Sequence, residues 1–346
     1  MQRLFRKLLD ITFENIRKKL FLLILLSLFS SILIFSSNIN KVYIGVKYSF
    51  RTFRTNGDII FVDPFGKKII SFNLYSRQVS NFLSNVGTFV IGVYKLEKGY
   101  ILVDRVDPSI VIISDFGERI SRVNLSKRVQ GSLFNGKQLY VLLEGGILEV
   151  FELNAENQLK KSLTHNFEGS PSYIFLWKDN IFVTYLWNNE RDIQFLGGQP
   201  KELGLTTPSL LIGDMLVDTR GGKLYNLTTN NIITISPYIS NGYYDQVENV
   251  YYVASMSNYS VYQIKDDKVI HSFKVPFTPT NISKIDDYMI ILSAPYNKVM
   301  ITKNGKDIIT FDTGDYPLEV FSLKDETKTG FAVYCSDSGE IYYYYF

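Results

Sequence analysis

Acidic residues are the side chains of this chain whose type and spacing come closest to catalytic chemistry. Two adjacent pairs, Asp266-Asp267 and Asp286-Asp287, stand between strand-like segments. Two carboxylates can cleave a glycosidic bond when they flank it, and a denser group of oxygens can bind calcium. The sequence gives no rule that pairs these acids across the fold. We therefore interpret both pairs as solvated turns.

Histidine and cysteine chemistry has few candidates. The two histidines, His165 and His271, lie in different repeats within strand-like contexts, and Cys335 is the single cysteine. These are too few ligands for a zinc site or a histidine-based triad, and one cysteine forms no intramolecular disulfide. No catalytic residue, metal ligand or cofactor is expected.

Three aromatic residues crowd one segment and form the candidate partner-binding group: Trp177, Tyr185 and Trp187. Large aromatic side chains at the rim of a domain commonly anchor protein or sugar partners, because they bury much area at a low entropy cost. In a chain with 24 Tyr and 25 Phe, core packing is the alternative interpretation.

An apolar run over residues 20–37 is expected to place the rest of the chain relative to a membrane. It contains no charge and only Ser as polar content. A helix needs about 20 mostly apolar residues to cross a bilayer. The run predicts a transmembrane signal-anchor helix that binds the lipid bilayer. Its anchoring side chains are Leu20, Phe21, Leu22, Leu23, Ile24, Leu25, Leu26, Leu28, Phe29, Ile32, Leu33, Ile34 and Phe35.

Basic residues set the expected topology. Arg17, Lys18 and Lys19 immediately precede the apolar run, and such clusters are retained on the cytoplasmic side. Residues 1–19 are thus expected to be cytoplasmic and residues 41–346 extracytoplasmic. The alternatives are a cleaved secretory signal, although no Ala-x-Ala site follows the run, and a buried core helix.

The charge balance argues against nucleic acid as a partner. Six of the 37 Lys and Arg residues and two of the 34 Asp and Glu residues precede residue 38, so the remainder carries 31 basic and 32 acidic residues. Nucleic-acid binding normally needs a basic field that neutralises phosphates. The domain has no such field.

From residue 41 onward, the sequence reads as a repeat of short strands. Apolar and polar residues alternate over four to eight positions between turn residues, which is typical of β-strands. Strand pairs around a tight turn recur roughly every 35 to 43 residues, near the period of four-stranded propeller blades. Eight such pairs begin at Asp58, Tyr100, Lys137, Asn180, Asp214, Asn249, Tyr288 and Gly330.

The repeats predict an all-β fold, a single β-propeller preceded by the one N-terminal transmembrane helix. Eight blades are favoured and seven are possible, with residues 228–248 as the unit that could be irregular. The segment Lys41 to Val46 is expected to complete the last blade and close the ring, which removes exposed sheet edges. A β-sandwich pair or a β-helix is the structural alternative.

The segments DMLVDTRGGKLYNLTTNNIITI and GFAVYCSDSGEIYYYYF resemble the strand-Gly-strand hairpins of WD40-like and quinoprotein-like propellers of the eight-bladed type. This resemblance covers most of residues 41–346. The chain lacks the Gly-His and Trp-Asp pairs of WD40 blades, and it lacks the repeated docking tryptophan of quinoprotein blades. We therefore carry over the fold and no cofactor.

The expected function is that of a membrane-anchored, extracytoplasmic protein-binding or scaffold module of the cell envelope, with a non-enzymatic role favoured. The alternative is an enzyme or receptor that binds or processes a glycan or small ligand, with acids converging at the mouth of the channel. A purely structural tether is a third possibility. Acids from different blades lying together would favour the enzyme, whereas an apolar aromatic face would favour protein binding.

Overall fold

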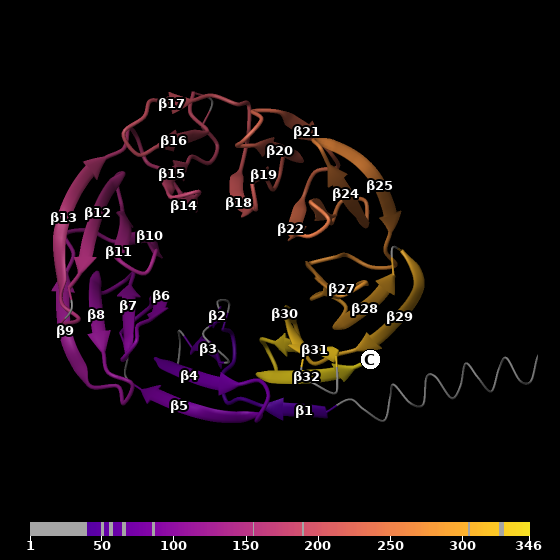
Figure 1. Cartoon of the computed structure of the whole chain (residues 1–346), viewed down its shortest axis with the longest axis horizontal. Coiled ribbons are helices and arrows are strands. Elements are labelled where there is room, and N and C mark those ends of the chain that lie inside the picture. The colour runs from indigo at the N-terminus through magenta and orange to yellow at the C-terminus, as the bar shows by residue number, and fades with distance from the viewer. Residues whose placement is uncertain are drawn as a thin grey trace, which may run out of the picture.

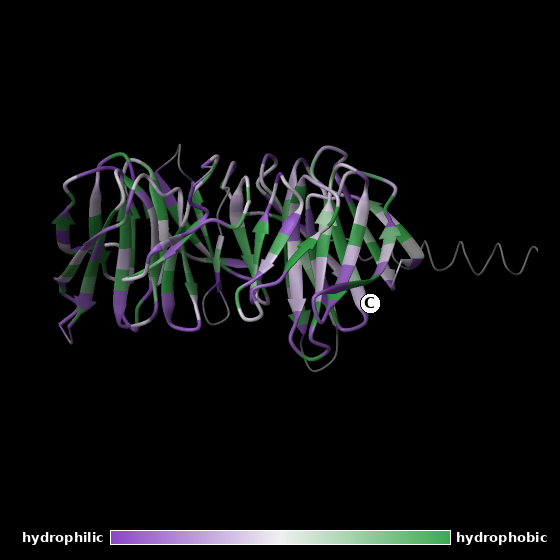
Figure 2. Ribbon diagram, turned by 90° about the horizontal axis from the view of Figure 1, so that it is seen from above, coloured by the Kyte–Doolittle hydropathy of each residue, from purple (hydrophilic) through white to green (hydrophobic). Residues whose placement is uncertain are grey.

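The computed structural model shows eight four-stranded sheets arranged as blades around a central axis, forming a shallow disc (Figures 1 and 2). It describes residues 40–49, 52–54, 58–63, 67–84, 87–154, 156–188, 190–303, 305–324 and 329–346. Consecutive strands of a blade are antiparallel neighbours, and the first strand of each blade lies nearest the axis. The predicted eight-bladed propeller is confirmed.

The first four blades follow the chain in order from the axis outward. Their strands are β2 (Thr52–Arg54), β3 (Asp58–Asp63), β4 (Lys68–Asn73) and β5 (Gln78–Ser84); β6 (Val90–Lys95), β7 (Tyr100–Asp104), β8 (Ser109–Ile113) and β9 (Arg119–Asn124); β10 (Val129–Phe134), β11 (Gln138–Leu143), β12 (Ile147–Leu153) and β13 (Leu159–Asn166); and β14 (Tyr173–Trp177), β15 (Asn180–Thr184), β16 (Ile193–Phe195) and β17 (Pro200–Lys201).

The last four blades repeat the order, and the eighth takes its outer strand from the other end of the domain. Their strands are β18 (Pro208–Ile212), β19 (Met215–Asp218), β20 (Lys223–Asn226) and β21 (Ile232–Thr234); β22 (Ile239–Asp245), β23 (Val250–Ser255), β24 (Ser260–Lys265) and β25 (Lys268–Lys274); β26 (Asn281–Ile285), β27 (Tyr288–Ser293), β28 (Lys298–Lys303) and β29 (Lys306–Asp312); and β30 (Pro317–Lys324), β31 (Thr329–Cys335), β32 (Glu340–Tyr345) and β1 (Asn40–Tyr43).

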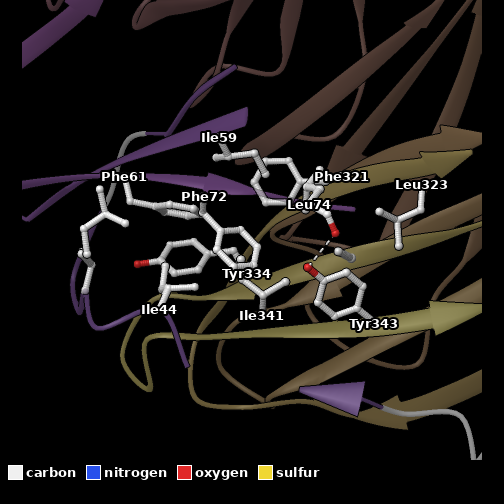
Figure 3. Packing of buried hydrophobic residues seen from close by; sticks show 13 residues of the cluster. Ile44, Ile59, Phe61, Phe72, Leu74, Phe321, Leu323, Tyr334, Ile341 and Tyr343 are labelled. Atoms are coloured by element: carbon white, nitrogen blue, oxygen red, sulfur yellow. Dashed lines mark hydrogen bonds between the residues drawn. The ribbon is translucent and has the colours of Figure 1, made fainter. Parts of the chain in front are cut away.

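The ring closes as the sequence predicted. Strand β1 pairs antiparallel with β32, from Asn40 opposite Tyr343 to Tyr43 opposite Glu340. An apolar cluster joins this blade to the first one, and Tyr343 donates a hydrogen bond of 3.0 Å to the Leu74 carbonyl there (Figure 3). Because two sequence-distant segments share one sheet, opening the ring would break backbone bonds and this packing together.

The core is divided among the interfaces between neighbouring blades. Eight apolar clusters are found among the described residues, one at each interface. The second and third strands of a blade are covered on both sides, so β23 is buried at every position and β27 at all but its first. Outer strands such as β13 remain largely exposed. Cys335 lies in this core, where burial raises the pKa of its thiol to about 12.

Residues 228–248 supply strands β21 and β22 to two complete four-stranded blades, so this region does not reduce the ring to seven. Strand β21 has three residues, and the pairing of β22 with β23 shifts register between Ile239 and Asn241. The predicted anchor over residues 20–37 and its preceding basic residues lie outside the described residues. Within the described part of the chain, no helix has the length and apolar character needed to span a bilayer.

Candidate interaction surface

The turns of the propeller gather on two faces. The upper face is formed by the segments that lead into each blade and by the turns between the second and third strands of each blade. The lower face carries the other two sets of turns. Backbone bonds link the two kinds of upper segment directly, as when Met256 donates to the Tyr238 carbonyl at 2.9 Å and Ser336 to the Tyr316 carbonyl at 3.0 Å.

The three predicted partner-binding aromatics do not form one surface. Trp177 ends β14 on the lower side, where its indole N–H donates to Asp214 Oδ1 at 2.9 Å. Tyr185 is buried, donates to Gln194 Oε1 at 2.7 Å, and has its pKa raised to about 12 by burial. Trp187 lies on the upper face and is 60% exposed. Of the three, Trp187 is thus the most exposed.

Trp187 belongs to a set of upper-face aromatics that share an unusual backbone conformation. Each has a φ between 53° and 59° and a side chain 42 to 60% exposed; the members are Tyr48, Trp187, Tyr238, Tyr259 and Tyr316. Bulky residues rarely adopt left-handed φ values, since Cβ then approaches the following carbonyl oxygen at a cost of about 1 kcal/mol. Strain of this kind often marks functional positions. We call these five residues the aromatic arc.

Backbone hydrogen bonds hold the arc in place. The amide of Tyr48 donates to the Ser336 carbonyl at 2.8 Å, that of Trp187 to the Thr206 carbonyl at 2.9 Å, and that of Tyr316 to Asn297 Oδ1 at 3.0 Å. These bonds fix the main chain and leave the rings directed away from the core. At these three positions the backbone is thus held by hydrogen bonds to neighbouring segments.

The centre of the arc is a stack of three side chains. The Arg220 guanidinium carbon lies 5.1 Å from the ring centroid of Trp187 and 5.9 Å from that of Tyr238. Both distances are within the range of cation–π attraction. A planar guanidinium held this way keeps its N–H donors in a fixed orientation.

Asp218 fixes the turn that carries Arg220. Its fully buried carboxylate accepts hydrogen bonds from the amides of Thr206 and Thr207, each at 2.9 Å, and from that of Gly221 at 2.8 Å. A Cβ at Gly221 would come within 2.0 Å of the same carboxylate, so glycine is required. Asp104 ends β7 in the same way and binds the turn amides of Val106 and Asp107.

Sequence reasoning found Trp187 but missed the other members of the arc and Arg220. A usable signal was present, because Tyr238 follows Pro237, Tyr316 precedes Pro317, and Tyr259 follows Asn258 within a turn. An aromatic residue at a position where turns favour Gly or Asn is conspicuous. Only the fold, however, shows that these turns share one face.

The acids of the innermost strands are engaged by other side chains. Glu319 on β30 accepts a hydrogen bond from Thr52, and burial raises the pKa of its carboxyl. Asp245 ends β22 and pairs with Lys284 at 2.5 Å. Among the described residues of the innermost strands these are the carboxylates, and they belong to blades two apart. In the same described part of the chain, no three His, Cys, Asp or Glu side chains are placed to share a metal ion.

A polar groove of about 710 Å³ lies between the sixth and seventh blades at the lower face. Lys284 lines the groove, and the ammonium of Lys284 lies 2.5 Å from Asp245 and 2.9 Å from Glu248. Burial opposes the charge of Lys284, but the two carboxylates raise its pKa above the usual value. The groove is thus built around a satisfied ion network.

Comparisons with known proteins identify the fold alone. No protein-family model and no curated protein sequence matches this chain. Among solved structures, Saccharomyces cerevisiae Sqt1 is similar with a TM-score of 0.68 at 11% identity, over 88% of this chain and 97% of that one. The computationally designed Ika8 protein gives a TM-score of 0.64 at 9% identity, over 88% and 98%.

BamB from Moraxella catarrhalis is also similar, with a TM-score of 0.61 at 12% identity, over 89% of this chain and 98% of that one. The resemblance to WD40-like and quinoprotein-like eight-bladed propellers is therefore confirmed at the level of the fold. Since propellers serve many unrelated functions, the function must be argued from this chain's own surface.

Proposed function

We propose that this chain is a membrane-anchored, extracytoplasmic propeller that binds a protein partner of the cell envelope through its upper face. The observation that carries the proposal is the aromatic arc. Exposed tyrosine and tryptophan side chains on a rigid backbone are typical of the centres of protein interfaces. Their left-handed backbone conformation places these rings at the surface, where each residue is 42 to 60% exposed.

The position of β1 is compatible with an anchored protein. This strand is the outermost of its blade, so the described part of the chain begins at the rim of the disc (Figure 1). The charge pattern around the apolar run at residues 20–37 supports a cytoplasmic N-terminus. A tether at the rim leaves the upper face open to a partner.

Protein binding is favoured over glycan processing by the inner strands. An enzyme that cleaves glycosidic bonds needs two carboxylates across one bond. In the described residues, the inner-strand acids Glu319 and Asp245 are held by Thr52 and Lys284, in blades that are not neighbours. The aromatic arc, in contrast, is exposed on the upper face, where a protein partner can contact it.

The proposal is tested by crosslinking in intact cells, followed by detergent purification of the full-length protein and identification of what is bound. We expect a reproducible envelope protein. The variant Tyr259→Ser/Tyr316→Ser should reduce its recovery at least about tenfold, as expected for interface aromatics.

A matched control removes two exposed apolar side chains from the lower face. Phe116 and Val247 are 89% and 96% exposed, and Phe116→Ser/Val247→Ser should leave recovery unchanged. Recovery of no envelope protein by the wild type would overturn the proposed function. Saturable glycan binding under those conditions would favour a ligand receptor instead.

A further inference from the structure

The stack of Trp187, Arg220 and Tyr238 singles out one point of the upper face. These are the three residue types most enriched at energetic centres of protein interfaces. Two of the three have left-handed backbones, with φ values of 55° for Trp187 and 56° for Tyr238. The ring distances of 5.1 and 5.9 Å place the guanidinium between both aromatics before any partner arrives.

The charge at this point is positive and uncompensated. Within the described part of the chain, no carboxylate pairs with Arg220 or with Lys223, which follows it in the same hairpin and donates to the Gly204 carbonyl. The nearby carboxylate of Asp218 is fully buried and occupied by amides of Thr206, Thr207 and Gly221. A binding partner can therefore supply the missing negative charge.

Resting on the proposed function, we propose that the Trp187–Arg220–Tyr238 stack is the docking point for an acidic peptide segment of the partner protein. A Glu or Asp carboxylate accepts hydrogen bonds from the Arg220 guanidinium, while apolar parts of the segment contact the flanking rings. A planar guanidinium binds carboxylate with two parallel hydrogen bonds, which lysine cannot reproduce.

A peptide fits the surface better than a membrane does. Anionic membranes attract clusters of several basic residues. The turn at the Trp187–Arg220–Tyr238 stack carries Arg220 and Lys223 as its two basic residues. One or two cations between aromatic rings can bind a single carboxylate of an extended peptide.

The direct test uses Trp187 as its own reporter. The chain has two tryptophans, so Trp177→Phe in the full-length protein leaves Trp187 alone. The probe is end-capped hexaglutamate, with end-capped hexaglutamine as the uncharged control. We expect a saturable change in Trp187 emission below about 1 mM hexaglutamate, none with hexaglutamine, and weakening as salt rises. Isothermal titration of the wild-type protein gives the same information if Trp177→Phe unfolds.

Matched arginine variants decide which residue is responsible. Arg220→Gln should weaken hexaglutamate binding at least about tenfold, and Arg220→Lys should fall between it and wild type, because charge remains without the planar fork. The control is Arg105→Gln, an exposed arginine in the equivalent turn of the second blade, whose amide donates to the Phe89 carbonyl. It should bind as wild type does.

Failure of this inference is separable from failure of the proposed function. If crosslinking recovers an envelope protein equally with wild type and Arg220→Glu, a partner exists but does not use the stack, and the inference is overturned alone. Absence of any hexaglutamate effect on Trp187 also overturns it. If the wild type recovers no partner, the proposed function fails, and this inference fails with it.

Discussion

The upper and lower faces of the propeller need the same backbone conformation but meet that need with different residues. Among the described residues, nine non-glycine positions on the lower face have positive φ, and seven of them are Asn or Asp. The upper face has seven such positions, and five are the aromatic arc. Asn and Asp tolerate left-handed φ because their short side chains bond the local backbone. Tyrosine and tryptophan gain nothing comparable there.

The lower face shows what such positions do when they serve stability. Asp267, with φ 57°, accepts hydrogen bonds from Asn226 at 2.6 Å, Thr229 at 2.6 Å and Asn231 at 2.8 Å, and so ties the fifth blade to the sixth. Tyr259 has φ 53° on the upper face, and its ring projects to 46% exposure. At these positions the lower turn contributes hydrogen bonds between blades, whereas the upper turn exposes an aromatic ring.

The largest expected effect is on stability, and it comes from a substitution at the lower face that should leave partner binding unchanged. Lys284→Met should lower the free energy of unfolding by about 3 kcal/mol, because it leaves the mostly buried Asp245 without its cation. Partner recovery from the folded fraction should not change. Urea unfolding measures the loss, and Lys284→Met/Asp245→Asn should regain part of it. A loss below about 1 kcal/mol would show that the pair is not structural.

The second prediction concerns the upper face, where a substitution should weaken partner binding and leave stability unchanged. Trp187→Ala should weaken partner binding by about 2 kcal/mol, the scale of an interface hot spot, and leave the unfolding free energy nearly unchanged because the side chain is 60% exposed. Affinity and urea unfolding are measured on the same preparation. An equal loss in both quantities would make Trp187 a structural residue and remove the distinction between the faces.

The third prediction concerns acid. Burial alone would raise the pKa of Asp267, but its three hydrogen bonds hold the pKa below the ordinary value. A carboxyl with a depressed folded pKa contributes stability above its unfolded pKa of about 3.9 and loses it as pH falls through the folded pKa. Unfolding free energy should therefore drop below about pH 4. Asp267→Asn should flatten that drop and cost about 1 kcal/mol at pH 7; an unchanged pH profile would contradict the assignment.

The smallest effect has the opposite sign. Tyr259→Asn should raise the unfolding free energy by about 0.5 kcal/mol, since asparagine adopts left-handed φ with less strain. Thermal unfolding measures the gain. The lower-face change Asp286→Tyr, at φ 50°, should do the reverse by a similar amount. If Tyr259→Asn destabilises the protein, the tyrosine ring has a structural role and the arc is not purely a binding surface.

Much of the fold was predictable because it repeats. Strand pairs at a nearly constant spacing indicated eight blades, and the structure has eight. The pairing of β1 with β32 followed from counting strands. Strand length was less predictable, since β16 and β17 have three and two residues although the fourth blade keeps the same four-strand order.

The candidate surface was less predictable because adjacency in the sequence does not indicate a shared face. Trp177 and Trp187 are ten residues apart, yet one ends β14 on the lower side and the other lies in an upper turn. Arg220 and Tyr238 come from the turns and connections of later segments, and no local pattern links them to Trp187. Their meeting depends on how neighbouring blades are rotated about the axis.

By itself, the sequence determined the strand repeat, the near-neutral domain charge and the expectation of a membrane anchor, since each depends on local composition or period. Only the tertiary structure decided which aromatics are buried, as Tyr185 is, and which are exposed on strained turns, as Tyr238 is. The physical reason is that burial depends on the neighbouring blade. A side chain's exposure is fixed when two sheets pack, and both sheets are needed to define it.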